Sequence, residues 1–205
     1  MRRSLSTIFL LFIILGCSRN QDHVGRKPSP PTIEFSAVDS LLNGRIKDDL
    51  LGISFSSPKG WTRIPDIVLI AAELSAKEKL GNPNQWPLRG IRMRDGFIEP
   101  GTGGMIIISQ VFPFDSYDSS ATMESYRKSY TDEDTSANVQ IAVFYSNGFK
   151  IHQLLFFDSK HVLFKMVFTQ PKLQHAVQFD FWFRRTAYPK FIKTIESVAG
   201  SVRIN

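Results

Sequence analysis

The segment 139–184, VQIAVFYSNGFKIHQLLFFDSKHVLFKMVFTQPKLQHAVQFDFWFR, decides the fold. It holds four apolar runs that short polar turns separate. The runs span residues 139–145, 149–157, 161–169 and 175–184. An Asn-Gly pair between two apolar runs, here Asn147-Gly148, is a strong signal for a β-hairpin. Asp158-Ser159-Lys160 and Pro171 interrupt the later runs. The segment therefore predicts four consecutive antiparallel strands.

The last of these runs alternates between two kinds of side chain. One set is apolar, and the other is mostly polar or charged. The apolar set is Val177, Phe179, Phe181 and Phe183. The mostly polar set is Gln178, Asp180, Trp182 and Arg184. Successive residues of a strand point to opposite faces, so the pattern predicts a sheet with one buried face and one mostly solvated face.

Both flanks of this segment add further elements. A helix is predicted over 188–198, because four apolar residues share one stripe, and a short strand or extended tail over 201–204 follows. The stripe is Phe191, Ile192, Ile195 and Val198. Upstream, 105–112 is predicted to form a strand that is apolar on both faces, and 91–94 a further possible strand.

A strand over 51–55 is expected to run into a Pro/Gly turn, after which Trp61 folds back over the core. For residues 33–49 the sequence is compatible with a short helical turn and with an edge strand.

A helix is predicted over 67–80, with Asp66 as its N-cap and Gly81 as its stop. Its inward face is expected to be Ile67, Ile70, Ala71 and Leu74. Ile67-Val68-Leu69-Ile70 would also suit a buried strand. A second helix is predicted over 120–130, before an acidic loop over 131–138.

A run of strands with helices at either end, without an alternating βαβ rhythm, predicts one α+β domain over 33–205 with a central antiparallel sheet flanked by helices. The opening Gly52-Ile53-Ser54-Phe55-Ser56-Ser57-Pro58-Lys59-Gly60-Trp61, the meander and the Ser197-Val198…Ser201-Val202 ending resemble PsbP-like domains over roughly residues 50–205. This resemblance implies a sandwich in which helices flank the sheet, and a role as an accessory or assembly factor. It supplies no catalytic residue. The long insertion around 82–104 departs from the family's compact pattern.

The N-terminus carries a predicted lipoprotein signal over 1–16. Arg2 and Arg3 precede the apolar run 8–15, which is far shorter than the roughly 20 residues of a spanning helix. Ile14-Leu15-Gly16-Cys17 resembles the bacterial lipobox, which implies cleavage after Gly16 and lipidation of Cys17, the only cysteine in the chain. The alternative is an incidental cysteine after an ordinary signal peptide.

The segment after the lipobox is predicted to be a disordered tether. Residues 18–32 contain one apolar side chain, Val24, and three prolines. Fifteen residues reach at most about 50 Å when extended. Together with Cys17 they place the domain in the cell envelope, and Ser18 implies the outer membrane if the cell has two membranes.

Charge and cysteine content exclude several classes of function and of structural site. Of the net charge of +6, two positive charges lie in the leader, two in the tether and only two in 33–205. The domain therefore lacks the strong basic excess that nucleic-acid binding needs. A single cysteine excludes an intramolecular disulfide framework and multi-cysteine metal sites. No cofactor is expected.

Three histidines, His152, His161 and His175, are the candidate bases within the domain. By alternation they are expected at the solvent-facing surface, and no Gly-x-Ser-x-Gly motif occurs. The glycine-rich stretch 101–104 precedes a strand and is interpreted as a turn, because phosphate loops follow a strand and open a helix. We therefore expect no enzyme, and an envelope hydrolase with an unrecognised site is the alternative.

Two acidic runs, 115–118 and 132–134, are interpreted as solvated loops, because their spacing fits no twelve-residue calcium loop. Divalent-cation binding there is a further alternative. Trp182 beside Arg184, with Lys165 and His152 expected near them, has the composition of a protein-binding hot spot, unless a helix covers the tryptophan. The sequence thus predicts a lipid-anchored, non-catalytic protein whose partner is an envelope protein or a small ligand.

Overall fold

The computed structural model describes residues 35–79, 90–112, 138–173 and 175–205. The signal peptide, Cys17 and the tether, the predicted helix over 120–130 and both acidic runs lie outside these residues, as does 80–89 of the insertion. Within the described part, no helix is long and apolar enough to cross a membrane.

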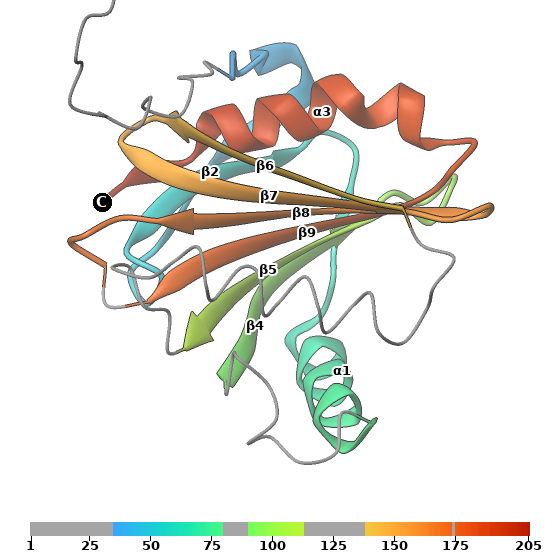
Figure 1. Cartoon of the computed structure of the whole chain (residues 1–205), viewed down its shortest axis with the longest axis horizontal. Helices are drawn as coiled ribbons and strands as arrows, with labels where there is room; N and C mark the ends of the chain where they lie inside the picture. Colours follow the sequence, from blue (N-terminus) through green and yellow to red (C-terminus); the bar gives the residue numbers. More distant parts are fainter. Residues whose placement is uncertain (1–34, 80–89, 113–137, 174) are drawn as a thin grey trace, which may run out of the picture.

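The main sheet has seven antiparallel strands in the order β3-β4-β5-β9-β8-β7-β6 (Figure 1). Their bounds are β3 Thr62–Arg63, β4 Gly90–Ile98, β5 Met105–Phe112, β6 Asn138–Ser146, β7 Phe149–Phe157, β8 His161–Thr169 and β9 Ala176–Arg184. The four predicted strands of the meander are therefore confirmed, and so are the strands predicted over 105–112 and 91–94, the latter extended at both ends. Asn147 and Gly148 both have positive φ, as a two-residue hairpin loop requires.

A smaller sheet and a helix lie over one face of the main sheet. The order of the small sheet is β1-β2-β10, formed by β1 Leu42–Asp48, β2 Ile53–Pro58 and β10 Arg203–Ile204, and a short 3-10 helix, Asp39–Leu41, precedes it. The helix α3, Tyr188–Ser201, contacts β2 and β9 and crosses the sheet on the same side (Figure 1). The predicted α+β fold is thereby confirmed, and 33–49, which the sequence left open, supplies both a helical turn and a strand.

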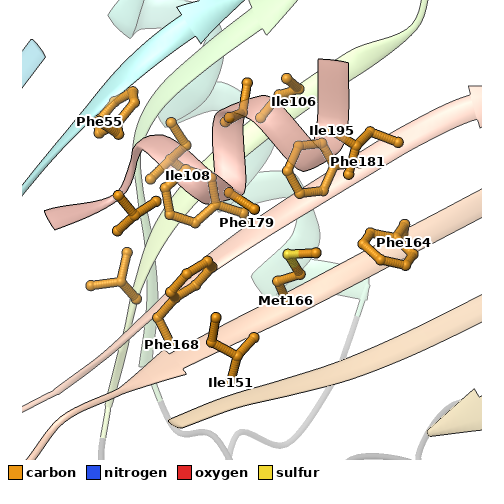
Figure 2. Packing of buried hydrophobic residues seen from close by; sticks show 14 of the residues in the cluster. Phe55, Ile106, Ile108, Ile151, Phe164, Met166, Phe168, Phe179, Phe181 and Ile195 are labelled. Atoms are coloured by element: carbon orange, nitrogen blue, oxygen red, sulfur yellow. The ribbon is translucent and has the colours of Figure 1, made fainter. Parts of the chain in front are cut away.

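The main core lies between this layer and the Phe179 face of the sheet. Figure 2 shows Phe55 of β2 and Ile195 of α3 packed with Phe179, Phe181, Phe168 and other residues of the sheet. Of the predicted helix stripe, Ile195 and Val198 are buried, whereas Ile192 is 37% exposed. Trp61 packs edge-on against Phe183 and Phe191, which confirms its predicted place over the core.

The opposite face of the sheet is buried too, so the prediction of a mostly solvated face was wrong. Gln178, His152 and Lys165 are 1%, 1% and 3% exposed. They share this face with an apolar cluster of Val111, Leu154, Phe156, Val167 and Ala176. Lys165 Nζ donates to Asp180 Oδ1, and Gln178 Nε2 donates to Asp180 Oδ2 at 2.6 Å. Because Lys165 and Gln178 both bond to Asp180, burial does not leave the charges of Lys165 and Asp180 uncompensated.

The helix α1, Asp66–Lys79, has the predicted bounds within one residue, but its orientation differs from the prediction. The helix face that was expected to pack on the core faces solvent instead. Ile67, Ile70 and Leu74 are 72%, 53% and 56% exposed. The buried contact is made by Leu69, next to Gly96 of β4, where an added Cβ would stand 3.2 Å from the leucine side chain. Glu73, one turn later, accepts a hydrogen bond from the Met93 N–H. In Figure 1, α1 lies beyond the β4 end of the sheet, away from α3.

Candidate functional site

The predicted Trp182–Arg184 surface lies where β8 begins and β9 ends. Antiparallel register sets His161 opposite Arg184 and Leu163 opposite Trp182. Arg184 is exposed and Trp182 is half-buried. We call the side chains gathered at this end of the sheet the aromatic–cationic patch, and its members are Phe157, His161, Trp182, Arg184 and Arg185.

The tryptophan of the patch is stacked on a histidine. The rings of His161 and Trp182 have centroids 4.8 Å apart and an interplanar angle of 28°. The His161 side chain is 40% exposed, so the ring pair borders solvent. A protonated imidazole on an indole gains a cation–π attraction.

Asp158 fixes the turn that carries His161. Its Oδ1 accepts the backbone N–H groups of Lys160 and His161, each at 2.6 Å. These hydrogen bonds lower the pKa of Asp158, because they stabilise the carboxylate. Oδ2 stands 3.7 Å from His161 Nδ1. The carboxylate therefore orders the turn and partly offsets the positive charge of the patch.

Arg185 extends the patch along the same end of the sheet. Its guanidinium lies 5.9 Å from the centroid of the Phe157 ring. Its Nη1 also donates to the Asp158 carbonyl at 3.0 Å, and its backbone N–H donates to the Lys160 carbonyl. This end of the sheet thus carries two arginines, a histidine and the Trp182 and Phe157 rings, which the register places on opposite faces. This composition suits an acidic protein partner.

Sequence reasoning found Trp182 and Arg184 but missed His161, which stacks on Trp182 and lies opposite Arg184, and the contact of Arg185 with Phe157 at the same end of the sheet. It placed Lys165 and His152 near Trp182 instead. Lys165 is held by Asp180, and His152 lies in the row of Val167 and Gln178, two rows from Trp182 on this face. The observed strands β8 and β9 have nine residues each and set His161 opposite Arg184, whereas the apolar runs in the sequence span nine and ten residues and do not fix this register.

The three histidines occupy different surroundings. His161 belongs to the patch, and His175 places Nε2 3.2 Å from the Leu51 carbonyl oxygen. His152 is 1% exposed, so its predicted surface position was wrong. Burial, with a smaller contribution from Lys150, lowers the pKa of His152 to about 4. The neutral imidazole is therefore the native form at neutral pH.

This buried histidine makes stability depend on pH. The folded pKa of about 4 lies below the ordinary value of 6.5, so below pH 6.5 the unfolded chain binds a proton that the folded chain excludes. Stability is therefore lost as the pH falls from 6.5 towards 4. We expect His152 to lower the free energy of unfolding by about 2 kcal/mol between pH 7 and pH 5.

Urea unfolding of the wild type and of His152→Gln at pH 7 and pH 5 measures this loss. The variant is expected to lose about 2 kcal/mol less than the wild type over that interval. His161→Gln is the matched control and is expected to keep the wild-type loss, because that ring is partly exposed. An identical pH dependence in His152→Gln and the wild type would contradict the assignment.

The stretch 101–104 forms the turn between β4 and β5, which confirms its interpretation as a turn. Glu99 N–H donates to the Gly104 carbonyl, and the Glu99 carboxylate accepts hydrogen bonds from Gly101 and Thr102. Gly103 has φ +74°. Among the described residues, no group of three or more His, Cys, Asp or Glu side chains could hold a metal ion.

Comparison with solved structures supports the fold. The chain is similar to cyanobacterial PsbP (CyanoP) from Synechocystis sp. PCC 6803, with a TM-score of 0.50 and 16% identity over 79% of this chain and 92% of that one. This likeness concerns the fold and agrees with the predicted PsbP-like sandwich.

Two further solved structures are similar at lower scores. LpqN of Mycobacterium tuberculosis, involved in cell envelope biogenesis, gives a TM-score of 0.47 and 11% identity, covering 75% of this chain and 83% of that one. The Ran-binding protein Mog1p of Saccharomyces cerevisiae gives a TM-score of 0.48 and 7% identity, covering 80% of this chain and 96% of that one. No protein-family model matches the chain, and comparison with curated proteins gives no match.

Proposed function

We propose that this chain is a lipid-anchored protein of the bacterial cell envelope that binds an acidic partner protein without catalysing a reaction. The observation that carries the proposal is the aromatic–cationic patch, where His161 stacks on Trp182 beside the exposed Arg184 and Arg185. Aromatic and arginine side chains are enriched among the residues that dominate binding energy in protein interfaces.

Anchoring is proposed through Cys17 of the Ile14-Leu15-Gly16-Cys17 motif. Two or more acyl chains hold a protein on a bilayer stably, whereas one does not. The tether over 18–32 would let the domain reach a partner up to about 50 Å from the bilayer surface. If the cell has two membranes, Ser18 favours the outer one.

Metabolic fatty-acid labelling with membrane fractionation tests the anchor. The wild-type chain is expected to incorporate label and to sediment with membranes, and Cys17→Ala to lose both. Ser18→Ala is the matched control and is expected to keep label and membrane retention. A label that persists in Cys17→Ala would contradict lipidation at this sulfur.

Photocrosslinking tests the docking surface. A photoreactive residue at Ser159, in the turn next to the patch, is expected to give a discrete adduct that Arg184→Glu/Arg185→Glu abolishes. Raising the salt concentration is expected to weaken it, because ions screen charge attraction. Lys59→Glu changes the charge of an exposed residue outside the patch and is expected to keep the adduct. An adduct that survives the double reversal would contradict docking here.

A further inference from the structure

A separate cavity of about 200 Å³ opens between α3 and the β7–β8 part of the sheet. Most of its lining is apolar, and three polar side chains join it. The apolar lining is Phe35, Phe164, Met166, Ile192 and Ile195, and the polar side chains are Gln153, Tyr188 and Glu196. Figure 2 shows Phe164 and Met166 on β8 and Ile195 on α3. An apolar cavity with a few convergent polar groups is the usual form of a small-molecule site.

Glu196 supplies the one carboxylate among the residues that line this cavity. Its side chain is 35% exposed, and Oε2 accepts a hydrogen bond from Lys193 Nζ at 2.7 Å. Lys193 does not line the cavity, and its side chain is 76% exposed. An exposed ion pair of this kind contributes little, so another ammonium group can replace the lysine at small cost.

The negative charge of Glu196 acts on Tyr188, which also lines the cavity. Burial, and next to it the negative charge of Glu196, raises the pKa of Tyr188. The phenol therefore stays neutral and is available as a hydrogen-bond donor or acceptor. A positive group entering the cavity would find both a carboxylate and a phenol oxygen as acceptors.

We propose that this cavity binds a small primary amine with a compact apolar body. The ammonium group takes the place of Lys193 on Glu196, and the apolar body lies against Met166, Phe164 and Ile195. The volume of about 200 Å³ is below the range of drug-sized sites, which limits the ligand to a single ring or a short alkyl chain. This site is independent of the aromatic–cationic patch, so each proposal can fail without the other.

Methyl NMR on the full chain in phosphatidylcholine nanodiscs, labelled at the methionine methyl groups, tests the site with phenethylamine as the probe. The Met166 methyl is expected to shift with a saturable concentration dependence, whereas Met93 and Met105 on the β4–β5 side are expected to stay unchanged. 3-Phenylpropionate, which has a carboxylate in place of the amine, is expected to cause no shift of Met166. Equal shifts with both compounds would overturn the proposal.

Two variants separate charge recognition from apolar partition. Glu196→Gln is expected to weaken phenethylamine binding about tenfold, because it removes a charge-assisted hydrogen bond. Lys193→Met removes the competing ammonium and is expected to tighten binding. Both residues lie at the exposed side of α3, and unchanged methyl spectra without ligand would show that each variant folds. Wild-type affinity in Glu196→Gln would overturn the proposal.

Discussion

Replacing Phe179 with alanine is expected to lower the free energy of unfolding by about 3–5 kcal/mol. Phe179 is fully buried at the centre of the main core. Its ring packs edge-on against Phe55 of β2 at 5.7 Å and lies 5.2 Å from Phe168 of β8. The truncation therefore opens a cavity at the contact between the two sheets. Small domains have only about 5–15 kcal/mol of stability in total, so this loss is a large part of it.

Urea unfolding followed by circular dichroism measures this loss, and two variants calibrate it. Phe179→Leu keeps most of the volume and is expected to cost less than the alanine variant. Tyr145→Ala removes an aromatic ring that is 39% exposed on the edge strand β6, and is expected to cost about 1 kcal/mol or less. A cost of Phe179→Ala no larger than that of Tyr145→Ala would contradict this account of the core.

Lys165→Met is expected to lower the free energy of unfolding by about 3 kcal/mol, because it leaves Asp180 largely buried without its cation. Lys165 and Asp180 side chains are 4% and 20% exposed. Removing one partner of a buried ion pair costs more than removing both, since the remaining charge has lost its compensation. Asp180→Leu is expected to be at least as costly, because the ammonium left behind is the more buried of the two.

The double variant Lys165→Met/Asp180→Leu completes the cycle. It is expected to be more stable than the sum of the single effects by about 2 kcal/mol, because both charges are then absent from the buried face. Thermal or urea unfolding of the four proteins gives the coupling energy. Additive losses would show that the two side chains do not stabilise each other.

The meander could be predicted because its signals are local. Asn147-Gly148 prescribes a hairpin loop whatever surrounds it, and the alternation of Val177, Phe179, Phe181 and Phe183 identifies the face that the core covers. The same is true of the stripe on α3 that contains Ile195 and Val198. In each case the face that the periodicity predicts to be buried is the face that the core covers.

The second face of the sheet could not be predicted from residue types alone. Alternation in β9 predicts that Gln178 and Asp180 are solvated, because they are polar, yet Gln178 is buried and both bond within the sheet. Pairing between strands sets Lys165 against Asp180, and alternation within one strand does not reveal that partner. In the structure Lys165 and Asp180 lie opposite each other at the centres of two nine-residue strands, whereas the runs in the sequence, of nine and ten residues, do not fix this register.

The sequence by itself determined the strands of the meander, β5 and helix α3, the hairpin at Asn147 and the face that carries the phenylalanines. Only the tertiary structure decided which face of α1 packs, which polar residues are buried, and that His161 stacks on Trp182. Periodicity shows which residues of an element share a face, but not which face packs against the core. That choice depends on which surfaces of the neighbouring elements are still uncovered. At α1, Leu69 packs next to the small Gly96, and the helix orients on that contact although three other aliphatic side chains, Ile67, Ile70 and Leu74, are then exposed.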